Sequence, residues 1–262
     1  MLVITEGLVW LIIALPIISF LVNGVLVRAF IGSNSRYAGY ITIAAIGASF
    51  VLSLLALATV MSDGSLDFET HHWIFIGGMN LSFGLILDQL SAIMLLVVSG
   101  ISLLVQIYGQ AYMDGDKSYT RYFAYMSLFT ASMLGLVLAR NMIQIFVFWE
   151  LVGVSSYLLI GFWMDRPSAA AAAKKAFIMT RFGDFGFLLG ILYLYSIDPS
   201  YMDVSVLYQA LEEHQIAASV ATWVALGLFA GAVGKSAQFP LHSWLPDAME
   251  GPTSVSALIH SA

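Results

Sequence analysis

Long stretches of apolar residues with few or no charges dominate this sequence. A helix that spans a membrane needs about 20 consecutive, mostly apolar residues. Seven stretches meet this requirement, and they cover residues 7–27, 37–61, 89–113, 122–139, 141–164, 171–197 and 216–239. An eighth begins near residue 253. We therefore expect an all-α fold, a polytopic transmembrane bundle with about seven complete spans and a truncated eighth.

The composition excludes several classes of soluble protein. Only 10% of the 262 residues are charged and 60% are hydrophobic, whereas soluble domains carry about 25% charged residues. The chain has no Cys, which excludes disulfides and thiolate-held iron–sulfur or zinc sites, and its five His are too scattered to predict a metal site. The formal charge of −6 argues against nucleic acid as a partner. We expect a multi-pass protein of the lipid bilayer.

The basic residues of the connecting loops predict the orientation of the bundle. All but one of them fall on one side of an alternating topology: Arg28, Arg36, Lys117, Arg121, Arg166, Lys174 and Lys175. Arg140 is the exception, and the acidic loops lie opposite. Because Lys and Arg are enriched in cytoplasmic loops, we expect the basic side to be cytoplasmic and the N-terminus to lie outside.

Two parts of the sequence depart from a plain series of complete spans. The outer loop at 72–86 holds two short apolar runs around Gly77 and Gly78, which weakly predict a β-hairpin, and an irregular loop explains them almost as well. The eighth span breaks off in mid-helix at Ala262. This ending predicts a fragment of a longer protein.

Charged residues inside the spans are candidates for function, because a charge at the bilayer centre costs from about 2.5 to more than 10 kcal/mol. Glu150 lies about 15 Å into its span. It must therefore face water or a partner inside the bundle, and the alternative to function is a buried structural ion pair. Arg181 and Asp184 are three residues apart and predict a local pair on one helix face. The alternative to a functional role is that Arg181 extends to the membrane interface and Asp184 neutralises its charge, and the sequence favours neither.

Lys235 lies in a glycine-rich run that ends at Pro240. The glycines predict close helix packing. Pro240 predicts a break in the span between about residues 234 and 242, next to the lysine, as in the broken helices of transporters. His260, in the eighth span, is a weaker candidate for proton transfer, since a lone His is more often a packed helix residue.

The runs 148–163 (FWELVGVSSYLLIGFW) and 234–262 (GKSAQFPLHSWLPDAMEGPTSVSALIHSA) resemble a known family. They are similar to the L-type, or chain 5, antiporter-like membrane subunit of proton-pumping NADH:quinone oxidoreductase, respiratory complex I. The runs 174–184 and 112–116 fit the same family, and the resemblance extends from about residue 80 to the end.

The resemblance implies a fold of two inverted five-helix repeats, each with a broken helix and a central lysine. This chain would hold helices 1–3 with the outer loop in 1–120. The incomplete first repeat, helices 4–8, would occupy 121–262. The implied location is a bacterial-type plasma membrane or an equivalent energy-coupling membrane.

By motif position, the resemblance also implies roles for the buried charges. Glu150 matches the family's charge-modulating glutamate, Lys235 its broken-helix lysine, and His260 the eighth-helix histidine of the central polar axis. Arg181 and Asp184 match a conserved sixth-helix pair.

We therefore expect proton transfer by Lys235 under the control of Glu150, in a translocase whose other membrane subunits are the partners of this chain. NADH, flavin, iron–sulfur clusters and quinone are expected in other subunits, and no cofactor or metal is expected here. One alternative is the large subunit of a multi-subunit sodium/proton antiporter. A second is a passive membrane scaffold, which needs neither Glu150 nor Lys235.

Overall fold

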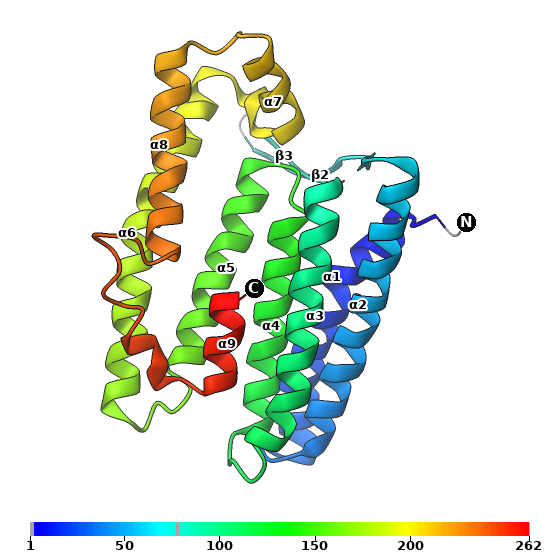
Figure 1. Ribbon diagram of the computed structural model, residues 1–262, viewed down its shortest axis with the longest axis vertical. Coiled ribbons are helices and arrows are strands. Elements are labelled where there is room, and N and C mark those ends of the chain that lie inside the picture. Colours follow the sequence, from blue (N-terminus) through cyan, green and yellow to red (C-terminus); the bar gives the residue numbers. More distant parts are fainter. Residues whose placement is uncertain (1–2, 77–78, 262) are drawn as a thin grey trace.

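The structure is a computed structural model that describes residues 3–76 and 79–261. Its long helices run up and down a bundle with short strands and turns at the ends (Figure 1). In chain order the elements are α1 Glu6–Leu21, the π-helical η1 Val22–Ile31, α2 Arg36–Asp63, β1 Leu66–Asp67, β2 His71–Ile76, β3 Met79–Phe83, β4 Ile86–Leu87, α3 Gln89–Tyr112, α4 Tyr119–Val137, α5 Met142–Ile160, α6 Pro167–Ile197, η2 Pro199–Met202, α7 Val204–Glu212, α8 Ala218–Lys235, η3 Asp247–Glu250 and α9 Thr253–Ser261.

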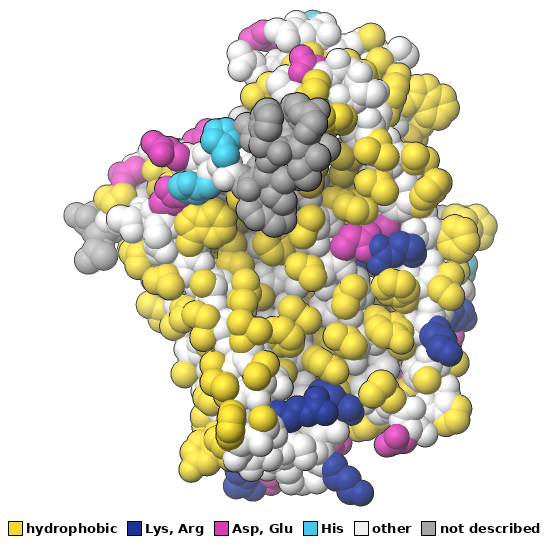
Figure 2. Space-filling view, turned by 180° about the vertical axis from the view of Figure 1, so that it is seen from behind, with side chains coloured by type: hydrophobic (Ala, Val, Ile, Leu, Met, Phe, Trp, Pro, Cys, Tyr) yellow, Lys and Arg dark blue, Asp and Glu magenta, His cyan; other side chains and the backbone are white. Residues whose placement is uncertain are grey.

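Apolar helices of membrane-spanning length account for most of the predicted spans. Within the described residues, six helical stretches are long and apolar enough to cross a membrane: Glu6–Ile31, Arg36–Asp63, Gln89–Tyr112, Met142–Ile160, Pro167–Ile197 and Ala218–Lys235. Their outer faces carry exposed apolar side chains such as Leu104, Phe182 and Trp223, and one face of the molecule is largely hydrophobic (Figure 2). The transmembrane bundle is confirmed.

The predicted span 122–139 forms α4, which is not among those six stretches. It is mostly buried against α1, α2, α3 and α5. Its hydroxyls bond to neighbouring helices: Ser127 Oγ lies 3.0 Å from Ser19 Oγ of α1, and Thr130 Oγ1 lies 2.5 Å from Ser102 Oγ of α3. Such bonds hold helices together in lipid. The count of seven complete spans stays a prediction.

The predicted hairpin in the outer loop is confirmed by two antiparallel strands. Strands β2 and β3 pair from His71 opposite Phe83 to Ile76 opposite Met79, and β1 pairs with β4 in a second two-stranded sheet. The turn residues 77 and 78 lie outside the described residues. The helical bundle therefore carries a small strand element at one end, and the irregular-loop alternative is wrong.

The glycines of α8 let its backbone touch that of α6, as the glycine-rich run before Pro240 predicts, and glycines of α6 lie opposite them. A Cβ on Gly183 would lie 2.6 Å from the carbonyl oxygen of Ala230, and one on Gly227 would lie 2.8 Å from that of Gly186. Both distances are shorter than real Cβ contacts. This glycine contact places the end of α8 directly against α6.

The predicted break near Pro240 is also confirmed. Helix α8 ends at Lys235, about halfway along the bundle, and the chain continues in turns before α9 runs back toward mid-height (Figure 1). The indole nitrogen of Trp244 donates a 3.0 Å hydrogen bond to the carbonyl oxygen of Gly234. This bond satisfies one of the carbonyls that a helix end leaves free.

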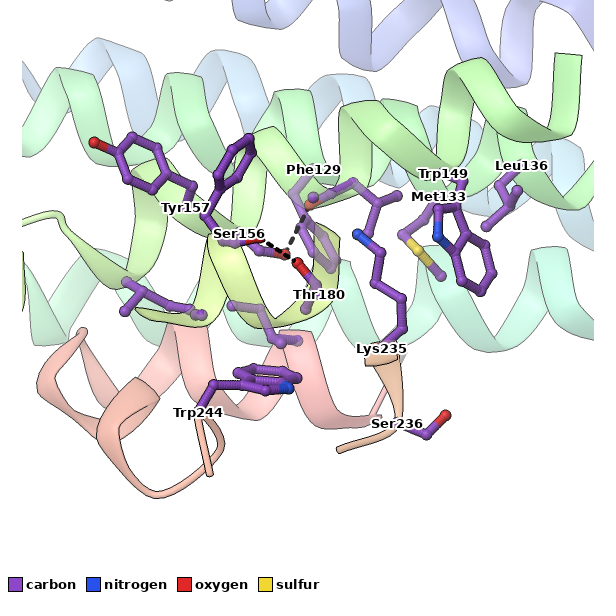
Figure 3. A pocket seen from close by; sticks show the side chains of 16 residues that line it. Phe129, Met133, Leu136, Trp149, Ser156, Tyr157, Thr180, Lys235, Ser236 and Trp244 are labelled. Carbon is purple, nitrogen blue, oxygen red and sulfur yellow. Dashed lines mark hydrogen bonds between the residues drawn. The ribbon is translucent and has the colours of Figure 1, made fainter. Parts of the chain in front are cut away.

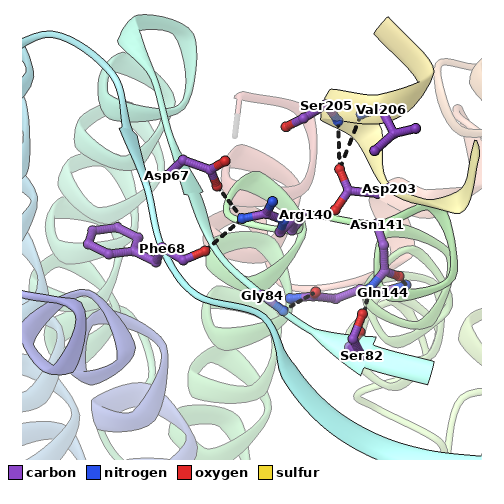
Figure 4. A network of polar contacts seen from close by, with 10 residues as sticks. All are labelled: Asp67, Phe68, Ser82, Gly84, Arg140, Asn141, Gln144, Asp203, Ser205 and Val206. Carbon is purple, nitrogen blue, oxygen red and sulfur yellow. Dashed lines mark hydrogen bonds and ion pairs between the residues drawn. The ribbon is translucent and has the colours of Figure 1, made fainter. Parts of the chain in front are cut away.

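Arg140 joins three segments at the end of the bundle that carries the strands (Figure 4). Its guanidinium contacts the carboxylate of Asp67, lies 2.6 Å from the carbonyl oxygen of Phe68, and lies 2.9 Å from Asp203 Oδ2. Asp203 in turn accepts from the backbone N–H of Ser205 and caps α7, a short helix that the sequence did not predict. The α4–α5 corner, the outer loop and the α6–α8 connection are thereby tied together.

Candidate functional site

Four of the five predicted site residues gather between α5, α6 and α8. The Arg181 guanidinium forms an ion pair with Glu150, and its Nη1 lies 3.9 Å from Asp184 Oδ2. The same Asp184 oxygen lies 3.8 Å from Lys235 Nζ. We call this series, Glu150–Arg181–Asp184–Lys235, the charge chain. Glu150 therefore connects to Lys235 through Arg181 and Asp184.

Local helix geometry explains how the charge chain is assembled. Arg181 and Asp184 lie one turn apart on α6, so that they share a face. Lys235 ends α8, and the preceding Gly234 packs against Gly183, the neighbour of Asp184: a Cβ on Gly234 would lie 3.2 Å from the Gly183 Cα. The glycine contact between the helices thus sets how closely the ammonium approaches the carboxylate.

Asp184 is the most buried member of the charge chain, with a side chain only 1% exposed, against 18% for Lys235, 20% for Glu150 and 38% for Arg181. One of its oxygens, Oδ1, accepts a 2.5 Å hydrogen bond from the indole nitrogen of Trp149. Its other oxygen, Oδ2, and Oε1 of Glu150 accept no hydrogen bond from the described residues. Such buried, unsatisfied oxygens are uncommon and call for an explanation.

Trp149 is a site residue that the sequence reasoning missed. Besides its bond to Asp184, its ring lies 5.8 Å from Lys235 Nζ, within range of a cation–π contact, and packs edge-on against Phe187. The signal was present in the sequence. A buried indole N–H needs a hydrogen-bond acceptor, and Trp149 stands beside Glu150 in the middle of an apolar span.

A cavity of about 280 Å³ lies between α4, α5, α6 and the break after α8, and the Lys235 side chain borders it (Figure 3). Most of its wall is apolar, and its polar lining residues include Ser156, Thr180, Lys235 and Ser236. The hydroxyls of Ser156 and Thr180 bond to carbonyls of their own helices, so that their oxygens keep lone pairs for an incoming donor. A cavity of this volume with polar groups can hold several water molecules.

His260 does not join the charge chain. Its ring is exposed and lies 6.4 Å from the ring of Trp244, measured between centroids. No hydrogen bond or ion pair within the described part of the chain connects His260 to Lys235 or Asp184. The same part of the chain contains no group of three or more acidic or His side chains placed to hold a metal ion.

Comparisons with known proteins agree with this fold. Residues 73–123 match the family model described as NADH-ubiquinone oxidoreductase (complex I), chain 5 N-terminus. Residues 139–262 match the model described as NADH:quinone oxidoreductase/Mrp antiporter, TM. The second match contains every member of the charge chain.

Several curated proteins align along nearly the whole chain. NAD(P)H-quinone oxidoreductase subunit 5 of Physcomitrium patens chloroplasts and chain 5 of Synechocystis are each 45% identical over 97% of this chain, and the Zygnema circumcarinatum chloroplast subunit is 48% identical over 97%. This chain spans only 36% to 38% of the length of these relatives.

A solved structure of an Mrp complex from Dietzia superposes with a TM-score of 0.81 and 27% identity, over 97% of this chain and 26% of that one. The two family models together match more than half of the chain, and the fold agrees with theirs. The chain belongs to the antiporter-like membrane subunits shared by NADH:quinone oxidoreductases and Mrp antiporters, and its N-terminal part is of the complex I chain 5 type.

Proposed function

We propose that this chain is part of a proton-translocating membrane subunit of a quinone oxidoreductase of the complex I type, and that the charge chain handles the proton. The observation that carries the proposal is the position of Lys235. Its ammonium lies at the end of a broken helix, 3.8 Å from a buried carboxylate on one side and beside a cavity that can hold several water molecules on the other. A proton on Lys235 thus has a counter-ion and a neighbouring cavity into which it can be released.

The charges balance when Lys235 holds its proton, because Glu150 and Asp184 then face Arg181 and Lys235. Opposite unit charges 4 Å apart attract by about 4 kcal/mol at an effective dielectric constant of 20. Removing the proton from Lys235 leaves the cluster with one net negative charge inside the membrane. The protonation of Lys235 therefore depends on whether another positive charge lies close to its counter-ion, Asp184.

Arg181 is placed to supply that other charge. It forms an ion pair with Glu150, and its Nη1 lies 3.9 Å from Asp184 Oδ2, about the same distance as Lys235 Nζ at 3.8 Å. If Arg181 turns from Glu150 to Asp184, Lys235 loses part of its counter-ion, and release of the proton into the cavity becomes easier. If Arg181 stays with Glu150, Lys235 keeps its proton. Two such arrangements constitute a switch that any change at Glu150 can bias.

The energy for the switch has to come from outside this chain. Moving one elementary charge against 100 mV costs about 2.3 kcal/mol. We assign NADH, flavin, iron–sulfur clusters and quinone to other subunits, whose redox chemistry would drive the charge chain. We also propose that the end of the bundle with the basic loops faces the cytoplasm and that the N-terminus lies outside.

The antiporter-like fold supports a second candidate function, the large subunit of a multi-subunit sodium/proton antiporter, because the Mrp complex of Dietzia superposes closely. Sealed membrane vesicles that contain the intact assembly separate the two. The proposal predicts that NADH drives proton uptake and that a quinone-site inhibitor abolishes it. Proton movement that follows an imposed sodium gradient, and that neither NADH nor the inhibitor affects, would favour the antiporter and contradict the proposal.

A further inference from the structure

Gly153 lies on α5, one turn beyond Trp149 and Glu150, and faces the end of the Lys235 side chain. A Cβ built on Gly153 would lie 2.6 Å from Lys235 Nζ, a distance that real Cβ contacts essentially never show. Within the described residues, Nζ is the only heavy atom from elsewhere in the fold within 4 Å of that position. The ammonium therefore occupies a notch in α5 that exists because residue 153 has no side chain.

Nothing in the backbone of α5 requires glycine at this position. Gly153 lies inside a regular helix, and the glycines with positive φ among the described residues are Gly32, Gly64 and Gly115. Glycine is less favourable than alanine inside a helix. The Lys235 ammonium is the group that needs the space left by the absence of a Cβ at Gly153.

We propose that Gly153 is a positioning residue of the proton pathway, which holds the Lys235 ammonium between Asp184 and the cavity. The notch lets Nζ lie 3.8 Å from Asp184 Oδ2 and 5.8 Å from the centre of the Trp149 ring at the same time. A side chain at 153 fills this place and moves the ammonium, while both helices stay where they are. This inference rests on the proposed function, in which Lys235 carries the proton.

The test is Gly153→Ala in the intact complex, with NADH-driven proton uptake measured in sealed vesicles. Since Nζ must shift by about 1 Å to restore a normal contact, and a misplacement of that size is able to slow a positioned reaction by up to about a hundredfold, we expect uptake to fall about tenfold or more. The complex should assemble in normal amounts, because alanine suits the helix. Uptake at the parental rate would overturn the inference.

Gly100→Ala is the matched control. It also adds a methyl group inside a helix, against the end of a side chain, the Phe50 ring at 3.1 Å, and that helix, α3, carries no member of the charge chain. We expect the control to assemble and to pump at the parental rate. A loss of pumping in the control equal to that of Gly153→Ala would show a general packing effect and overturn the inference.

The double variant Gly153→Ala/Lys235→Ala keeps the inference testable even if Gly153→Ala assembles poorly. Removing the Lys235 side chain empties the notch, so that the added methyl group should become harmless or raise the unfolding temperature of the complex. An assembly defect that persists in the double variant would contradict the inference. If Lys235→Ala alone pumps normally, the proposed function itself fails, a result distinct from failure of Gly153→Ala alone.

Discussion

Trp149 donates a 2.5 Å hydrogen bond from its indole nitrogen to Asp184 Oδ1. The bond ties the middle of α5 to the middle of α6 at the most buried carboxylate of the charge chain. It leaves Asp184 Oδ2 to face Lys235 and Arg181. One side chain thus orients the carboxylate on which both cations depend.

Replacing Trp149 with Phe should impair proton transport and leave the fold intact. The change keeps an aromatic ring against Phe187 and removes the N–H that orients Asp184. The loss of a hydrogen bond to a charged group, about 1.5–3 kcal/mol, predicts roughly tenfold or more slower NADH-driven proton uptake. Trp223→Phe is the control, because Trp223 is 66% exposed on α8. Equal uptake by the two variants would contradict the role of Trp149.

Asp184→Asn should be more damaging than the loss of an exposed carboxylate. The substitution removes the counter-ion of Lys235 and leaves two cations facing a neutral amide, so that proton uptake should fall by roughly tenfold or more. Asp165→Asn, in an exposed position, should transport at the parental rate. Vesicle proton uptake at matched NADH oxidation measures both, and normal uptake by Asp184→Asn would remove this carboxylate from the pathway.

Arg140→Gln should loosen the end of the bundle that carries the strands. The neutral Gln side chain cannot form the ion pairs that Arg140 makes with Asp67 and Asp203. We expect this loss to lower the free energy of unfolding by about 2 kcal/mol. The segment after α6 should then open more often. We expect faster limited chymotrypsin cleavage at Tyr201, which is partly buried. Arg166→Gln is the control, since Arg166 is exposed and stacks on Trp163. Unchanged cleavage in Arg140→Gln would contradict the role of this network.

Single cysteines can test the proposed orientation, because residues 1–262 contain none. In inside-out vesicles, a membrane-impermeant thiol reagent should label Lys117→Cys and spare Glu213→Cys. Right-side-out vesicles should give the reverse. The opposite pattern in both preparations would place the N-terminus inside.

The sequence predicted the elements of this fold better than the contacts between them. Apolar length alone located the long helices, and Pro240 with the glycine-rich run located the break after Lys235. Spacing along one helix also predicted that Arg181 and Asp184 share a face. These features depend on residues close together in the chain.

The partners of the buried charges could not be predicted in this way. That Arg181 binds Glu150 while Asp184 faces Lys235 depends on how α5, α6 and α8 are rotated against one another, which no periodicity encodes. Arg140 shows the same limit. Arg140 is the one basic loop residue on the acidic side of the predicted topology. The folded chain explains this position, because Arg140 pairs there with two carboxylates from distant segments.

The most direct test of the account is the number of protons moved per NADH oxidised in sealed vesicles, compared for Lys235→Ala, Glu150→Gln and the parent complex. The account predicts that both variants lose most of this ratio, roughly tenfold or more, and that Glu150→Asp, which keeps the charge, loses less. An undiminished ratio in both Lys235→Ala and Glu150→Gln, as a passive scaffold predicts, would contradict it.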